Sequence, residues 1–404
     1  MMKKFMSFAL ALCMAVSLAA CGGATSSSAA ASTAGSTAAG ASGTASSTAA
    51  IKVGGIGPVT GGAAVYGIAV KNGMELAVAD INAEGGIQFE IKFADDEHDA
   101  EKSVNAYNSL KDWGMQLLMG TVTSTPCVAV QAEAKADNMY LLTPSASSTS
   151  VISDAQGNFY GNSFQVCFTD PNQGVASADY IADNKIASKV GIIYDSSDVY
   201  SSGIYEKFVA EAKTKGLEVV AAEAFTADSK TDFSVQVQKM QSAGAELVFL
   251  PIYYTEASLI LNTADQIGYK PMFFGCDGLD GLLGVDNFDT TLAEGVMLLT
   301  PFAADATDDA TKDFVAKYEA AYGETPIQFA ADAYDAMYII KAACEKAGVT
   351  ADMDMSAICD ALKVAMTEIS VDGLTGEGMT WSATGEVNKA PKAVKIVDGA
   401  YAAM

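Results

Sequence analysis

The sequence of 404 residues contains a single histidine, His98, and far fewer basic than acidic side chains. With one histidine, a Ser-His-Asp or Cys-His catalytic system is hard to build, so we expect no catalytic residues. The 24 Lys and Arg residues against 49 Asp and Glu leave a formal charge of −25. Such an acidic chain repels phosphates, so we expect no nucleic-acid partner. Attraction to an anionic membrane surface is equally disfavoured.

The chain also lacks the motifs of nucleotide, hydrolase and zinc sites. The glycine-rich stretch 57–67 contains neither G-x-G-x-x-G nor G-x-x-x-x-G-K-[ST]. There is no G-x-S-x-G nucleophile elbow and no Cys-x-x-Cys spacing. His98 lies in the acidic stretch 95–99, where carboxylates could hold a hard cation. Charge runs are more often solvated, so we predict a loop that caps a helix starting near Ala100, with no metal and no cofactor.

No apolar run at the amino end is long enough to span a membrane. A basic start is followed by the apolar run Met6–Val16, which has the length of a signal peptide. Leu18-Ala-Ala-Cys21 then resembles the bacterial lipoprotein signal. The resemblance implies a signal peptide over residues 1–20 and a lipid on Cys21 that anchors the protein to the outer face of the cell membrane. The alternative is an ordinary secretory signal with a chance cysteine.

Residues 21–50 are almost only Ala, Ser, Thr and Gly and cannot form a core, so we predict a flexible tether. Five cysteines follow the tether: Cys127, Cys167, Cys276, Cys344 and Cys359. An odd, scattered set is a poor disulfide framework, so we predict buried free thiols. A bridge between Cys344 and Cys359 is the alternative.

From Ile51 onward, short apolar runs alternate with stretches whose apolar residues recur at helical spacing. We predict strands at Ile51–Ile56, Phe89–Phe93 and Met115–Met119, and helices at Ile68–Asn82 and Ala100–Asp112. This β-α-β-α-β order predicts a parallel sheet with helices on both faces. The same alternation returns between residues 189 and 274. The length also favours two domains, so we predict two doubly wound α/β lobes.

Small hydroxyl residues follow two of the predicted strands in the first lobe. They lie in Gly120-Thr-Val-Thr-Ser124 and in Thr143-Pro-Ser-Ala-Ser147, and helical spacing resumes after the first. Such residues often do no more than cap helices. Free N–H groups at a helix start also bind carboxylate or phosphate. Two such turns on adjacent parallel strands would converge in the crevice where open α/β sheets bind ligands. We therefore predict an anion site in the first lobe.

Tyrosines and carboxylates follow strands of the predicted second lobe. Tyr200 follows one strand, Tyr253 and Tyr254 follow another, and Asp277 and Asp280 lie among glycines after a third. A carboxylate beside tyrosines can hold an ammonium through a charge-assisted hydrogen bond and a cation–π contact. Asp277 could instead do no more than order its glycine turn. Together the lobes offer the charge pattern that a zwitterionic α-amino acid requires.

Several motifs in their order and spacing resemble the substrate-binding proteins of branched-chain amino acid ABC transporters. The resemblance covers nearly all of residues 51–400 and rests on Gly57-Pro-Val-Thr-Gly, Tyr66-Gly, Ile81-Asn-Ala-Glu-Gly-Gly-Ile, Asp95-Asp-Glu, Gly120-x-Val-Thr-Ser, Thr143-Pro-Ser-Ala-Ser and Phe164-Gln-Val-Cys-Phe-Thr-Asp-Pro-Asn-Gln-Gly. It implies a type I periplasmic-binding-protein-like fold, two lobes on a three-strand hinge that close around a ligand. The first lobe would comprise residues 51–168 and 300–371, and the second residues 169–299 and 372–404.

The resemblance also implies which residues bind the ligand. Ser124 and Ser147 would take the α-carboxylate, with the Ser145 backbone carbonyl nearby. Tyr253 and Asp277 would take the α-ammonium.

The walls of the side-chain pocket would come from Tyr66, Val122 and Tyr200. Two positions depart from common relatives: Leu279 stands where an aromatic residue is frequent, and Thr123 stands where some relatives have a disulfide cysteine. These departures leave the class of site intact but put the size of the pocket in doubt.

We therefore expect a lipid-anchored, monomeric receptor that binds an amino acid, branched-chain or otherwise apolar, and delivers it to the transmembrane subunits of an ABC permease. Within the same class, the ligand could be an amide, urea or an aromatic acid, or the protein could act as a sensor. An extracytoplasmic hydrolase using Asp277 and Asp280, or a structural surface protein, are the alternatives from other classes.

Overall fold

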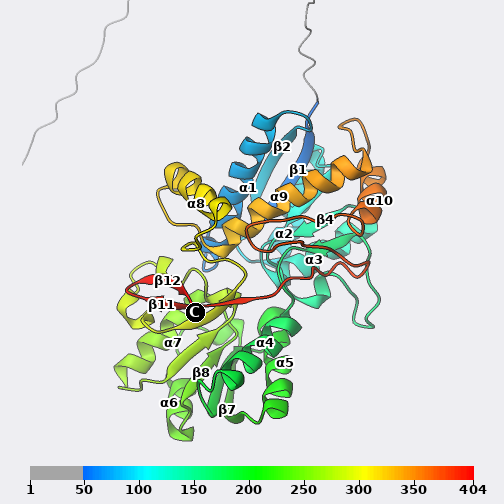
Figure 1. The fold of residues 1–404 in the computed structure, drawn as a ribbon. Helices are drawn as coiled ribbons and strands as arrows, with labels where there is room; N and C mark the ends of the chain where they lie inside the picture. Colours follow the sequence, from blue (N-terminus) through cyan, green and yellow to red (C-terminus); the bar gives the residue numbers. More distant parts are fainter. Residues whose placement is uncertain (1–48) are drawn as a thin grey trace, which may run out of the picture. The chain divides into compact units, whose positions relative to one another are not determined.

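The computed structural model describes residues 49–404, so the predicted signal peptide, Cys21 and most of the tether lie outside the described residues. Two sheets organise the described part of the chain (Figure 1). The first sheet has the order β2 (Phe89–Asp95), β1 (Ile51–Gly57), β3 (Leu117–Gly120), β4 (Leu141–Thr143) and β5 (Ser163–Gln165). All its neighbouring strands are parallel, as the β-α alternation predicts.

The second sheet has seven strands, in the order β12 (Ala400–Ala403), β11 (Lys392–Val397), β10 (Met297–Thr300), β9 (Met272–Gly275), β8 (Leu247–Leu250), β6 (Lys189–Asp195) and β7 (Glu218–Phe225). From β7 to β10 the pairing is parallel. The last two strands run antiparallel to their neighbours. A tight turn joins them, and a hairpin of this kind requires antiparallel pairing.

Helices cover both sheets. Those that pack with the first sheet or on one another beside it are α1 (Ala64–Glu84), α2 (Ala100–Trp113), α3 (Ser124–Asp137), α8 (Asp309–Tyr322), α9 (Gln328–Ala347) and α10 (Met355–Ala365). Those of the second sheet are α4 (Asp170–Asp183), α5 (Val199–Lys215), α6 (Ser234–Ala243) and α7 (Tyr254–Gln266). The structure thus confirms two doubly wound lobes, each with helices around a mostly parallel sheet.

The chain passes between the sheets three times: between β5 and α4, between β10 and α8, and between α10 and β11. Before the third passage, the segment 371–389 still lies beside the first sheet (Figure 1). Trp381 Nε1 donates to the Gln165 carbonyl at 2.8 Å, and Asp335 accepts the Thr375 N–H at 2.9 Å. The boundary at residue 371 stays a prediction, and these contacts favour a later one, near Lys392.

Helix α1 begins four residues earlier than the periodicity predicts, at Ala64 instead of Ile68. Tyr66 therefore lies on the helix and not in the preceding loop, and its side chain is fully buried. Gly67 hides this start in the sequence because glycine is a poor helix former. The tertiary structure requires it, since a Cβ at this position would lie 1.9 Å from the Pro58 carbonyl oxygen.

All five cysteines of the described residues are buried and free, which confirms the prediction of thiols instead of a disulfide. Burial raises the pKa of the Cys127 thiol to about 11, so it stays protonated and unreactive near neutral pH. None of the helices in residues 49–404 is long and apolar enough to cross a membrane.

Candidate functional site

The two hydroxyl-rich turns of the first lobe meet, as their places after adjacent strands predict. The Thr143 hydroxyl donates to the Thr121 carbonyl at 2.7 Å, and the Ser145 hydroxyl donates to the Val122 carbonyl at 2.7 Å. The Ser124 hydroxyl accepts the Ser148 N–H at 3.2 Å. These bonds hold the turn after β3 against the turn after β4. They place Ser124 and Ser145 side by side at the carboxyl edge of the sheet.

Ser124 is the first residue of α3, and Thr123 is its N-cap. The Thr123 side chain makes no capping bond to the helix. Its hydroxyl pairs instead with His98 Nδ1 at 2.9 Å. The first N–H groups of α3 and the positive end of its dipole therefore face the crevice without a capping oxygen, which favours a bound carboxylate.

The second lobe contributes a buried carboxylate, Asp277, at the end of β9. Its two oxygens accept hydrogen bonds from the Tyr200 hydroxyl at 2.6 Å and from Gln173 Nε2 at 3.0 Å. Burial raises the pKa of Asp277 to about 7, and the bonds from Tyr200 and Gln173 oppose this shift. A nearby cation would stabilise the carboxylate further, so this position favours an ammonium group.

Aromatic rings surround the Asp277 carboxylate. Tyr253 stacks on Tyr200 with ring centroids 5.0 Å apart and planes 8° apart. Tyr66 meets Tyr253 edge to face at 5.6 Å and lies 4.3 Å from the ring of Phe329. Electron-rich faces beside a carboxylate bind ammonium groups, while the ring edges offer an apolar wall.

These groups enclose one small cavity between the lobes, which we call the cleft cavity. It is lined by Tyr66, Val122, Thr123, Ser124, Ser145, Tyr200, Tyr253, Asp277, Gly278 and Phe329. Its volume is about 10 Å³, which is room for roughly one water molecule. A larger solute fits only if the lobes part at this face, so binding must be coupled to their movement.

Hydrogen bonds between the lobes hold this closed arrangement. The Tyr66 hydroxyl donates to the Gly278 carbonyl at 2.5 Å and accepts the Tyr254 N–H at 3.2 Å. Beside it, the Thr125 hydroxyl donates to Asp198 at 2.8 Å. Tyr66 therefore acts as a latch between α1 and the second lobe.

Seven of the eight predicted ligand-binding residues line the cleft cavity, and Ser147 does not. Ser147 is buried, and its carbonyl accepts the Asp170 N–H at 3.0 Å. Burial raises the pKa of Asp170 well above its usual value, and the Ser147 hydroxyl opposes this shift. The turn after β4 thus directs Ser145 to the cavity and Ser147 toward the start of α4.

Sequence reasoning missed Thr123, Gly278 and Phe329 as lining residues. Thr123 was considered as a helix cap, and Gly278 contributes only its backbone. Phe329 is the second residue of α9, more than 100 residues beyond the motifs of the first lobe, and no local pattern indicates its role.

One local prediction was wrong. His98 is half-buried instead of solvated, and its ring meets Tyr253 edge to face at 5.3 Å. Its neighbour Asp99 does cap α2, by accepting the Lys102 N–H. Tyr254 also lies beside the site, because α7 begins there, and its ring lies 4.7 Å from Tyr66.

A sequence model of the family described as periplasmic binding protein matches residues 50–400. A Leu/Ile/Val-binding protein homolog of Brucella melitensis is 33% identical over 313 residues, which is 75% of this chain and 81% of the relative. A Leu/Ile/Val-binding protein of Rhizobium johnstonii, BraC3, is 30% identical over 322 residues, or 78% of this chain and 84% of the relative.

Among solved structures, the branched-chain amino acid transporter substrate-binding protein LivJ of Streptococcus pneumoniae, in complex with isoleucine, is 27% identical. The match covers 88% of this chain and 98% of that one, with a TM-score of 0.77.

Within residues 49–404, no group of three or more His, Cys, Asp or Glu side chains is arranged to hold a metal ion.

Proposed function

Because the chain belongs to the periplasmic binding protein family, we propose that it is an extracytoplasmic receptor that binds a branched-chain or other apolar amino acid and delivers it to an ABC permease. The supporting observation is that two groups of opposite chemical character face each other across the cleft cavity. One half is a helix start with hydroxyls, and the other is the buried Asp277 carboxylate among tyrosines. No lysine is among the residues that line the cavity, so a ligand must supply the positive charge.

In this proposal the ligand lies across both lobes. Its α-ammonium pairs with Asp277 and lies against the face of Tyr253, while its α-carboxylate accepts hydrogen bonds from Ser124 and the N–H groups at the start of α3. The Ser145 carbonyl accepts a second hydrogen bond from the ammonium. Ser147 acts indirectly, through its contact with the turn and with Asp170.

The side chain of the ligand lies against apolar surface from Tyr66, Val122, Tyr200 and Phe329. Burying an aliphatic side chain of the size of leucine contributes about 1.5–3 kcal/mol. A ligand held by both lobes favours a state in which the lobes close around it, by its differential affinity for that state. The permease then distinguishes the loaded receptor by its closed pair of lobes. No covalent chemistry is needed, and Asp277 serves binding instead of hydrolysis.

The remaining parts of the proposal concern the whole chain. Residues 1–20 are a signal peptide, Cys21 carries the lipid, and residues 21–50 tether the receptor to the outer face of the membrane. Residues 51–168 with 300 to about 391 form one lobe, and residues 169–299 with the strands from Lys392 onward form the other. The receptor acts as a monomer, since one pair of lobes holds every group the ligand needs.

The first test is thermal unfolding of the protein with each of the twenty amino acids. A ligand that binds only the folded state stabilises it by about 2.7 kcal/mol at a hundredfold excess over Kd. We expect leucine, isoleucine or valine to raise the Tm, and Asp277→Asn to remove the effect. Asp280→Asn is the matched control, because Asp280 is equally buried and only three residues away but does not line the cleft cavity.

Two other results would redirect the proposal. Stabilisation by benzoate, urea or simple amides, with no response to any amino acid, would retain the receptor class and reject the zwitterion. A response to leucine that persists in Asp277→Asn would contradict the assignment of the ammonium site. In vivo labelling with a radioactive fatty acid, lost in Cys21→Ser, would test the anchor.

A further inference from the structure

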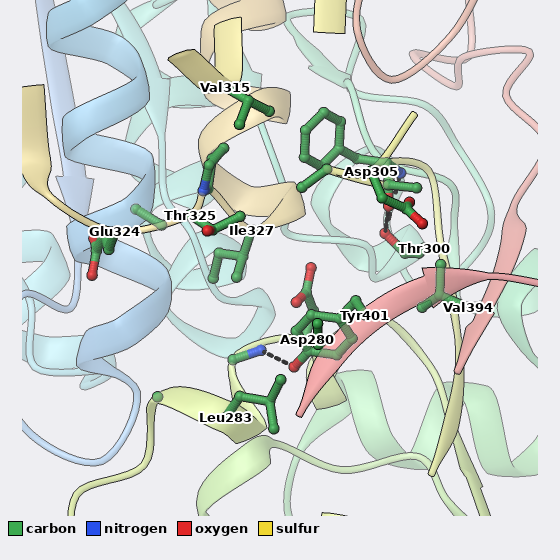
Figure 2. A pocket seen from close by; sticks show the side chains of 18 of the residues that line it. Asp280, Leu283, Thr300, Asp305, Val315, Glu324, Thr325, Ile327, Val394 and Tyr401 are labelled. Atoms are coloured by element: carbon green, nitrogen blue, oxygen red, sulfur yellow. Dashed lines mark hydrogen bonds between the residues drawn. The ribbon is translucent and has the colours of Figure 1, made fainter. Parts of the chain in front are cut away.

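A second cavity lies between the lobes near the crossing from β10 to α8. We call it the hinge pocket, and its volume is about 470 Å³. Its walls come from the start of α1, the turn 280–284 after β9, the crossing segment 300–305, α8, the turn before α9, and strands β11 and β12 (Figure 2). This volume lies in the range of small-molecule sites in proteins, which are concave and mostly apolar.

The hinge pocket is separate from the cleft cavity, although the two share a wall. Helix α1 presents Tyr66 to the cleft cavity and Val65 to the hinge pocket. The turn after β9 does the same with Asp277 on one side and Asp280 on the other. A molecule in the hinge pocket therefore meets none of the groups that bind the proposed amino acid.

Asp280 is the buried polar group of this pocket, with only 5% of its surface exposed. Its Oδ2 accepts the Gln328 N–H at 2.9 Å, but its Oδ1 has no hydrogen-bond partner among the described residues. The Tyr401 hydroxyl is near enough to this carboxyl to lower its pKa but makes no well-formed hydrogen bond to Oδ1. It accepts the Gly281 N–H at 3.0 Å and donates to the Leu279 carbonyl at 3.4 Å. A buried carboxylate oxygen without a donor is costly, so a donor from a ligand would be strongly favoured.

All the charged side chains that line the hinge pocket are acidic. Asp305, Glu319 and Glu324 join Asp280 among the lining residues, and no lysine does. Burial raises the pKa of Asp280 to about 7, which a cation beside it would reverse. Most other lining residues are apolar, with Phe302 and Val315 among them. The lining therefore complements a molecule with a positively charged head and an apolar body.

We propose that the hinge pocket binds an amphipathic monoamine, whose ammonium donates to Asp280 Oδ1 and whose apolar body lies against Phe302, Val315 and Ile327. Because both lobes and the crossing segment form its walls, such a ligand contacts the parts that move when the lobes open. The hinge pocket and the cleft cavity have no lining residue in common.

The test uses three probes of similar shape and different charge: phenethylamine, phenylethanol and phenylacetate. Each is titrated calorimetrically into the full-length protein, with and without saturating leucine. We expect phenethylamine to bind with a Kd at least about tenfold below that of phenylethanol, because one charge-assisted hydrogen bond contributes more than the 1.4 kcal/mol that a tenfold change requires. Phenylacetate should bind weakest, and leucine should not displace the amine.

Two variants assign the binding to the pocket. Asp280→Asn retains an oxygen for the Gln328 N–H and should remove the preference for the amine over the alcohol. Val315→Trp places an indole in the pocket and should weaken all three probes. The control Asp265→Asn makes the same charge change at an exposed position on α7 and should leave all three affinities unchanged. Cooperative urea unfolding shows that each variant is folded.

Three results would overturn the inference. They are equal binding of the three probes by the unaltered protein, an amine preference that survives in Asp280→Asn, or displacement of the amine by leucine. The titration without leucine keeps this test separate from the proposed function, since the amine should bind even if the cleft cavity takes a different solute.

Discussion

Replacing Asp277 by asparagine should stabilise the protein while it abolishes ligand binding. The side chain is buried, and burial raises the pKa of its carboxyl from 3.8 to about 7. The unfolded chain therefore releases this proton at lower pH than the folded protein does. Stability falls as the pH rises from about 4 to about 7, and the cost stays constant above that range. Asparagine has no proton to release, so it removes this cost.

The magnitude follows from the size of the shift. At 1.36 kcal/mol per pKa unit, ionisation of Asp277 costs about 4 kcal/mol at pH 8.5, about 2 kcal/mol at pH 5.5 and less than about 1 kcal/mol at pH 4. These are upper values, because asparagine cannot reproduce both bonds, from Tyr200 and Gln173, as well as a carboxylate does. The gain in unfolding free energy of Asp277→Asn should therefore grow with pH.

Urea unfolding of the unaltered protein and the variant, without ligand, at pH 5.5 and at pH 8.5 measures both gains. A variant that is less stable at pH 8.5, or a gain that does not depend on pH, would refute the reasoning about burial.

The same carboxyl sets the pH dependence of binding. Because an ammonium requires the ionised form, the Kd for the amino acid should rise about tenfold per pH unit below 7 and stay level just above it.

Two further predictions concern the latch and a buried ion pair. Tyr66→Phe leaves the Gly278 carbonyl without its donor in the ligand-free protein, so urea unfolding without ligand should show a loss of unfolding free energy of about 1–3 kcal/mol. Tyr140→Phe, which removes a buried hydroxyl that has no partner among the described residues, should cause no such loss. Lys389→Met leaves Asp332 buried without its partner, 2.9 Å away in the intact protein, and should lower the unfolding free energy by about 3–5 kcal/mol at pH 8 in urea. The double variant with Asp332→Leu should recover most of that loss, and a failure to do so would show that the pair stabilises the fold beyond its charges.

Local sequence patterns predicted much of the fold and of the site. Apolar periodicity indicated the strands and helices of both lobes, because alternate burial leaves a repeat that any short window contains. The turns around Ser124 and Ser145 were recognisable, since small hydroxyl residues after a strand signal a helix start. Asp277 stood out as a carboxylate among glycines. Each of these inferences depends on residues within one turn or one element.

Helix α1 and the segment before it show where such patterns fail. Gly67 indicated a loop, yet it lies inside helix α1. The residue there is glycine because Pro58 leaves no room for a Cβ. Ser145 and Ser147 both follow strand β4 and carry the same hydroxyl, and only packing decides which of them lines the cleft cavity. Phe329 joins the site from a helix that returns after the whole second lobe.

Local periodicity and side-chain chemistry were enough to predict the α/β class, the two lobes and the chemical character of the two halves of the site. How these halves meet depends on tertiary packing. The hydrogen bond from Tyr66 to Gly278 joins positions 212 residues apart. The walls of the hinge pocket around Asp280 come from both lobes and from the segment 300–305 that crosses between them. Contacts at such separations depend on the packing of whole lobes, and no short stretch of residues encodes that packing.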